Sequence, residues 1–328
     1  MGNRANFVVV KDQGWQLYYS HWSGYRVLDA LIGGPALALR YATSLRPSAD
    51  NEWVSPRWAD GGAVVDLDHR RLLFFGDELM LGMAERRAVL SVLGAVWPDY
   101  VIGWAYDGTA ALARYVGIEL PADRSGMQPT IRLARDRNSW CHVVSVVDAT
   151  GRLRLWPLRH FNQAWHGPAL LDKLPGRGAA RLSWGQIPEG GVHVDVPKKT
   201  VGTWHTADTM GICTALPGLW SGWRTECWAD RFEEHVLRCN GALRVPEVDL
   251  AAGIDEVQAG IQQRVFQSFA DSPAVQIVAL AKLLAPGRPG LVVSEDAITD
   301  QAARPTEAEW ARFVDACDGL RVRRAEPA

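Results

Sequence analysis

Two histidines and two aspartates lie within one short stretch of the chain and have the side chains needed for acid–base chemistry or metal binding. They are His193, Asp195, His205 and Asp208. Side chains alternate along a strand, so His193 and Asp195 share a face, and a hairpin is expected to bring His205 within reach of both. Imidazole and carboxylate groups bind zinc, manganese or iron, and an imidazole beside a carboxylate can act as a general base. All four are candidate catalytic residues, and the first three are also candidate metal ligands.

No recognised motif frames these residues, which favours solvated hairpin residues or hydrogen-bonded structural groups over a catalytic or metal site. The chain contains no HExxH, GxGxxG, GxxxxGK[ST] or GxSxG motif. A second set, Cys213, Cys227, His235 and Cys239, has residue types suited to zinc, with His235 and Cys239 one helical turn apart. Its long, irregular gaps favour buried thiols instead. The sequence therefore predicts no cofactor, with a divalent metal as the alternative.

The aromatic residues are dominated by tryptophan, with 15 Trp against 7 Tyr and 8 Phe. An indole supplies a large apolar face and one N–H group, which suits both core packing and ligand stacking. The tryptophans expected in the core are Trp58, Trp97, Trp104, Trp184, Trp220 and Trp228. The candidate ligand-binding residues are Trp15, Trp22, Trp53, Trp223 and His21.

The elements that must hold these residues belong to an internal repeat. The segment 57–80, RWADGGAVVDLDHRRLLFFGDELM, reappears in weaker form at 187–210 as IPEGGVHVDVPKKTVGTWHTADTM. The match extends in both directions, and its offset falls from 137 (Gly14 to Gly151) to 129 at the Gly-Gly pairs and 124 (Trp104 to Trp228). Loop deletions in the second copy produce such a decrease. A tandem duplication therefore organises most of the chain.

In each copy, the expected order of secondary-structure elements is ββα, ββα, βα, with strands outnumbering helices. This pattern predicts an α+β fold: two copies of a ββα-rich unit with mainly antiparallel sheets, plus a C-terminal helical α/β extension. We place the first unit at 1–125, a linker at 126–135, the second unit at 136–250 and the extension at 251–328. The extension is expected to hold helices over 252–270 and 273–284, a Thr306–Glu309 capping box, and a closing strand at 320–322.

Composition restricts the partners and the compartment. The net charge of −2 provides no general attraction to nucleic acid. No apolar run approaches the ~20 residues of a membrane helix. Five cysteines without a paired spacing, and a polar opening without a signal peptide, favour a reduced cytoplasm. The expected partner is a protein or a small molecule, with no nucleic acid and no membrane.

The segments MGNRANFVVV, YYSHW and WADGGAVVDLD resemble the openings of soluble proteins of high-GC bacteria for which no activity is known. The resemblance implies a bacterial cytoplasmic protein and no residue roles. Two functions remain. The first is a binding module with an aromatic-lined groove for a protein or small polar ligand. The alternative is a hydrolase with a His/Asp site, with or without a metal, in the second copy.

Overall fold

The computed structural model describes residues 3–121, 130–135, 141–159, 163–206, 211–266, 273–284, 293–299 and 302–325. The chain divides into two compact units. The first unit consists of Met1–Leu79, Ala84–Leu120 and Leu250–Ala328, and the second of Met80–Met83 and Pro121–Asp249. The segment after Leu250 thus belongs to the same unit as the N-terminal part of the chain.

A six-stranded sheet forms the centre of the first unit, in the order β3-β2-β1-β4-β5-β6. Its strands are β1 (Arg4–Lys11), β2 (Gly14–Ser20), β3 (Arg46–Ser48), β4 (Ala59–Asp66), β5 (Arg71–Gly76) and β6 (Val101–Trp104). The hairpins β1–β2 and β4–β5 are antiparallel, whereas β1 pairs with β4, and β5 with β6, in parallel.

The second unit repeats this arrangement in a five-stranded sheet of order β12-β11-β10-β7-β8. Its strands are β7 (His142–Val147), β8 (Leu153–Leu158), β10 (Gly190–Asp195), β11 (Thr200–His205) and β12 (Arg224–Cys227). Again the hairpins are antiparallel and the junctions β7–β10 and β11–β12 are parallel. A separate two-stranded sheet joins β9 (Leu182–Ser183) to β13 (Leu243–Arg244). The predicted α+β class with two similar sheets is confirmed, and both sheets are mixed.

Matching contacts outside the strands follow the same pattern. Gly34 and Gly167 both have positive φ, at 83° and 58°. A Cβ atom at either glycine would lie within 2.7 Å of a backbone carbonyl oxygen, at Val96 in one unit and Leu219 in the other. The indoles of Trp97 and Trp220, which directly follow those carbonyl groups, each donate to a backbone carbonyl, at 2.7 and 2.9 Å. The two units therefore share a glycine turn held against a tryptophan-bearing segment.

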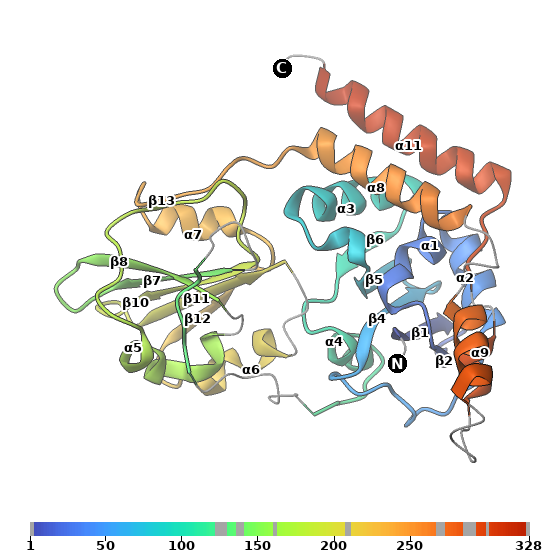
Figure 1. Ribbon diagram of the computed structural model, residues 1–328, viewed down its shortest axis with the longest axis horizontal. Coiled ribbons are helices and arrows are strands. Elements are labelled where there is room, and N and C mark those ends of the chain that lie inside the picture. Colours follow the sequence, from blue (N-terminus) through green and yellow to red (C-terminus); the bar gives the residue numbers. More distant parts are fainter. Residues whose placement is uncertain are drawn as a thin grey trace. The chain divides into compact units, whose positions relative to one another are not determined.

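Helices cover both faces of the second sheet. Figure 1 shows α7 (Phe232–Arg238) on one face and α5 (Leu170–Lys173) and α6 (Ile212–Leu219) on the other. Val144, Val192 and Val194 pack beneath α6, and Val143 and Trp204 face α7, as the period-two alternation of strands requires.

The first unit contains the remaining helices. They are α1 (Val27–Leu31), α2 (Pro35–Ser44), α3 (Met83–Val96, which begins at the last residue of a second-unit segment), α4 (Thr109–Tyr115), α8 (Leu250–Val265), α9 (Pro273–Leu284), α10 (Glu295–Ile298) and α11 (Glu307–Ala325). Ile254, Val257 and Ile261 form the expected buried stripe of α8. The capping box of α11 is confirmed, since Glu309 accepts from the Thr306 amide at 2.7 Å and Thr306 accepts from the Glu309 amide at 3.2 Å.

Several local predictions were wrong. Residues 320–322 continue α11 and form no strand. Trp58 is 57% exposed and packs against the guanidinium groups of Arg4 and Arg57 instead of entering the core. Trp104 lies opposite Phe74 and Cys227 opposite Thr203, so the structural counterpart of Trp104 is Cys227 and the tryptophan match was off by one.

The cysteines also differ from expectation. Cys213 and Cys227 form a disulfide, whereas their spacing in the sequence favoured buried thiols. Cys141, Cys239 and Cys317 are buried and do not take part in this disulfide. In the part of the chain that the structure describes, no helix has both the length and the apolar character needed to cross a membrane.

A buried ion-pair cluster holds α8 to the rest of the first unit. Arg264, whose side chain is 9% exposed, bonds Asp77 at 2.9 and 3.1 Å and Asp29 at 2.8 Å. Burial raises the pKa of Asp29, and the charge of Arg264 opposes that rise. Both carboxylates therefore depend on the guanidinium for compensation in a low-dielectric site.

We expect Arg264→Leu to lower the free energy of unfolding by ~3–5 kcal/mol, because it leaves buried carboxylates without their main partner. Urea denaturation measures the change. Arg321→Leu is the matched control, since Arg321 pairs with the exposed Asp255 at 2.7 Å and its loss should cost ~0–1 kcal/mol. Equal effects of the two substitutions would contradict the assignment.

Candidate functional site

The predicted histidine pair does not form. In the β10–β11 hairpin, His193 lies opposite Gly202 and His205 opposite Gly190. Because Gly190 and His193 are an odd number of residues apart, the two imidazoles point to opposite faces of the sheet. The expectation that His205 joins His193 and Asp195 is therefore wrong. Asp208 lies outside the described residues.

His205 belongs to a different set of contacts. Its Nε2 lies 2.8 Å from the Thr203 hydroxyl, and its ring centroid is 6.2 Å from that of His142. Both histidines are buried, at 4% exposure. His205 is thus a buried polar residue on the α5–α6 face, separate from His193.

Asp195 has a turn-forming role that both units share. Its carboxylate accepts from the Lys198 amide at 3.0 Å and pairs with the Lys198 ammonium at 2.7 Å. In the first unit, Asp66 accepts from the His69 amide at 2.8 Å and contacts the His69 ring at 3.0 Å. Asp195 shares a face with His193, as predicted, but its carboxylate holds the turn.

His193 instead joins a buried cluster formed by Ser145, His235 and Cys239. Ser145 lies beside His193 across the parallel β7–β10 junction, and α7 brings His235 over both. The Ser145 Oγ is 2.7 Å from His193 Nδ1 and 2.6 Å from His235 Nε2. The ligand atoms of His193, His235 and Cys239 all lie within 4.8 Å of one another. These three residues could hold a metal ion.

The hydrogen bonds of the cluster have a fixed direction. The Trp204 indole N–H donates to His235 Nδ1 at 3.1 Å, and an indole can only donate. Neutral His235 must then carry its proton on Nε2, and it donates to Ser145 Oγ. The Ser145 hydroxyl donates in turn to His193 Nδ1. This series of hydrogen bonds therefore ends at His193, whose Nε2 carries a proton that is directed away from Ser145.

Burial keeps the two imidazoles neutral. Burial, together with a smaller contribution from the nearby charge of Arg238, lowers the pKa of His193 to about 4. It also lowers the pKa of His235 well below its usual value, with a contribution from His193. Burial raises the pKa of the Cys239 thiol to about 11. At neutral pH the cluster is an uncharged hydrogen-bonded network.

The first unit has apolar side chains at the same positions. Val8 lies beside Val64 across the β1–β4 junction, just as Ser145 lies beside His193. The strands and helices that follow, β6–α4 and β12–α7, have equal lengths and equal spacing. The counterparts of Ser145, His193, His235 and Cys239 are therefore Val8, Val64, Leu112 and Val116. The fold itself does not require these polar side chains.

The zinc-type set considered from the sequence is only partly assembled. His235 and Cys239 enter the cluster, whereas Cys213 and Cys227 are joined in the disulfide. Ser145 was missed because it lies in an ordinary strand sequence. Its signal was present in the repeat, where a serine replaces an inward-facing valine of the first copy.

The candidate ligand-binding aromatics have separate sets of contacts within their own units. Trp15 and Trp53 contact each other, with ring centroids 6.3 Å apart. The Trp22 indole donates to the Ala297 carbonyl at 3.1 Å, and His21 Nδ1 lies 3.0 Å from the Tyr19 hydroxyl. Trp223 belongs to the second unit and packs on Trp220 with a centroid distance of 5.1 Å. None of the five lines either pocket described below.

A pocket of about 470 Å³ opens beside His193 at the carboxyl ends of β7 and β10. Its charged groups already pair with one another. Lys198 pairs with Asp195, and Glu226 receives both Arg224 and Arg238. The pocket therefore provides solvent access to the cluster without an unpaired charge that would attract a large ligand.

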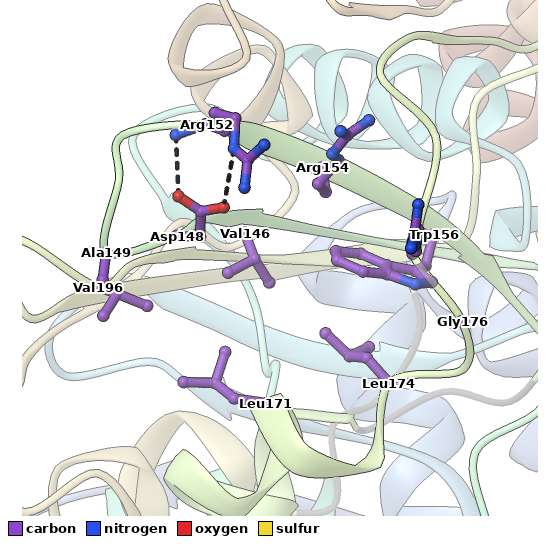
Figure 2. Close-up of a pocket in the computed structure, with 11 residues that line it drawn as sticks. Val146, Asp148, Ala149, Arg152, Arg154, Trp156, Leu171, Leu174, Gly176 and Val196 are labelled. Atoms are coloured by element: carbon purple, nitrogen blue, oxygen red, sulfur yellow. Dashed lines mark hydrogen bonds and ion pairs between the residues drawn. The ribbon is translucent and has the colours of Figure 1, made fainter.

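A larger cleft of about 710 Å³ lies at the same end of the sheet, on the face covered by α5. Figure 2 shows Val146, Trp156, Leu171 and Leu174 around it, with polar groups at its edge. The lining contains three guanidinium groups and one carboxylate, which leaves a net charge of +2. The charged lining residues are Arg152, Arg154, Arg177 and Asp148.

The local sequence explains the shape of this cleft. Arg154 and Trp156 are two residues apart on β8 and so share a face. The Trp156 indole donates to the Pro175 carbonyl at 2.9 Å, which fixes the ring. Gly178 lies against that ring, where a Cβ atom would be 2.6 Å from it. The glycine therefore lets the loop after α5 close over Trp156.

Comparison with protein-family models, with curated proteins and with solved structures finds no match. The function of the chain must therefore be inferred from the chemistry of its own residues, because fold alone does not determine function.

We expect the stability of the protein to depend on His193 between pH 7 and pH 4. A pKa lowered from 6.5 to about 4 means that the folded state resists protonation of His193. Its stabilising contribution is complete above pH 6.5 and is lost as the pH falls toward 4, an effect of about 3 kcal/mol. The difference in unfolding free energy between the wild type and His193→Gln should shrink by that amount. Urea denaturation at both pH values measures it, and a constant difference would contradict the assigned burial.

Proposed function

We propose that the protein is a ligand-binding protein and that the cleft of the second unit binds a small organic anion. One observation carries this proposal. Arg154 and Arg177 line a partly apolar cleft, and among the described residues neither has a carboxylate partner within ion-pair distance. Arg152, in contrast, is paired with Asp148 at 3.5 Å. Two guanidinium groups are thus available to a ligand.

The lining defines the chemistry of the ligand. A guanidinium fork matches the geometry of a carboxylate or phosphate and forms strong, charge-assisted hydrogen bonds. The indole of Trp156 and the side chains of Leu171 and Leu174 offer an apolar surface for an aromatic or alkyl group. A volume of about 710 Å³ suits a small molecule. The preferred ligand therefore combines one anionic group with a flat apolar body.

A binding function was also expected from the sequence, but at an aromatic-lined groove instead of the cleft of the second unit. The similar order of the two sheets supports a tandem duplication as their origin. A protein partner, a cytoplasmic location and the absence of a nucleic-acid partner remain predictions. The aromatic groove also remains a prediction, although its residues contact different neighbours in the two units.

A hydrolase with a His/Asp site remains the alternative. The closest arrangement to a nucleophile with a base is Ser145 with His193. Ser145 has an exposed fraction of 0% and His193 of 4%, so a substrate carbonyl has no room to approach the hydroxyl. A divalent metal bound at this cluster would change this chemistry. The geometry of the described residues therefore supports binding more strongly than hydrolysis.

Phenyl phosphate, inorganic phosphate and phenol test the proposed cleft, because the last two are the halves of the first. Isothermal titration calorimetry should show that phenyl phosphate binds at least ~10-fold more tightly than inorganic phosphate, since its ring is buried on Trp156. Arg154→Gln should weaken phenyl phosphate binding by ~10–100-fold through the loss of a charged hydrogen bond.

Arg181→Gln is the matched control, because Arg181 is an exposed arginine of the same unit that does not line the cleft. Its affinity for phenyl phosphate should equal that of the wild type. Three outcomes contradict the proposal: no binding of any probe, equal binding of phenol and phenyl phosphate, or equal losses in Arg154→Gln and Arg181→Gln.

A further inference from the structure

We propose that His193, His235 and Cys239 form a binding site for one divalent cation of borderline softness, of the Zn²⁺ type. The site is distinct from the arginine cleft, because it lies on the opposite, α7-covered face of the second sheet. It also differs from the metal site suggested by the sequence, in which His205 and Asp195 were ligands.

The ligand set determines the class of cation. Two imidazoles and a thiolate favour Zn²⁺ and related ions over Mg²⁺ or Ca²⁺, which prefer oxygen ligands. The three ligand atoms lie within 4.8 Å of one another, so a small displacement of the side chains brings them around one ion. Ser145 Oγ lies between the two imidazoles and offers a fourth ligand or a partner for a bound water.

The first unit provides an internal comparison. The four counterpart positions, Val8, Val64, Leu112 and Val116, are all apolar in the same topology, and the first three are fully buried. Buried polar groups that the fold does not need cost free energy, so their joint presence in the second unit points to a ligand. The pocket beside His193, about 470 Å³ in volume, gives an ion a route from solvent to this otherwise buried site.

Binding requires two proton movements. The S–H bond of Cys239 breaks, a metal–sulfur bond forms, and one proton passes to solvent. His235 must also move its proton from Nε2 to Nδ1 so that Nε2 can bind the ion, with no net loss of a proton. That tautomer places two donors, His235 Nδ1–H and the Trp204 indole N–H, against each other. Trp204 therefore opposes ligation, and its hydrogen bond weakens metal binding by about 10-fold.

Titration of the full-length, chelator-treated protein with Co²⁺ tests the site. Co²⁺ replaces Zn²⁺ and gives a thiolate-to-metal charge-transfer absorption when sulfur is bound. We expect saturation at one Co²⁺ per chain, with this absorption present and one proton released. Cys239→Ser should remove the absorption and weaken binding by at least ~100-fold, more than the loss of an outer-shell partner costs.

A second variant replaces the cluster by its counterparts from the first unit, with the substitutions Ser145→Val, His193→Val, His235→Leu and Cys239→Val. Because the first unit carries these apolar side chains at the equivalent positions, this variant is expected to fold, as judged by circular dichroism, and to bind no Co²⁺. His205→Gln is the matched control, since His205 is equally buried on the other face, and it should bind as the wild type does.

Trp204→Phe removes the donor that opposes the required tautomer and should tighten Co²⁺ binding by about 10-fold. The proposal is overturned if the wild type shows no saturable binding, or if binding persists in the apolar cluster variant. A loss in His205→Gln as large as in Cys239→Ser, or an unchanged affinity in Trp204→Phe, would also overturn the assigned ligands. A negative result in the Co²⁺ experiments would not contradict the proposed anion binding, because the cleft is tested with different probes and variants.

Discussion

The parallel pairing of β7 with β10 is the constraint on which the chemistry of the second unit depends. This ladder places Ser145 beside His193 and directs both side chains toward α7. The equivalent ladder of the first unit places Val8 beside Val64. One hydrogen-bonded junction thus produces an apolar core in one unit and a polar cluster in the other. The carboxyl ends of the same two strands also support both pockets, one on each face.

A buried polar network of this kind is stable only when each member has a partner. Ser145 connects the two imidazoles, and Trp204 satisfies the remaining nitrogen of His235. In a low-dielectric interior, the loss of one member leaves the others unsatisfied, whereas replacing the whole set by apolar groups removes that cost. The energies of its members are therefore coupled, and the stability change caused by a single substitution includes the effect on the other members.

Much of the fold was predictable because it depends on local patterns. The repeat identified both sheets, the proline at position 35 marked the start of α2, and the Thr306–Glu309 pair marked the start of α11. The site was less predictable. Strand register decides which face His205 occupies, and no local pattern in the hairpin encodes it. Cys239 is near His193 only because α7 crosses the sheet. The arginine cleft combines β8 with the loop after α5, segments whose contact the sequence did not suggest.

The division of the chain has a consequence for the order of folding. The helices that begin at Leu250 complete the first unit, so 129 residues (121–249) separate them from the part of that unit that ends at Leu120. While that segment is a flexible chain, joining the two parts carries a loop-closure entropy that rises with the logarithm of its length. Folding of the second unit removes most of this cost. During synthesis the second unit is also complete before the C-terminal helices emerge. The unit that begins the chain is therefore the last to be finished.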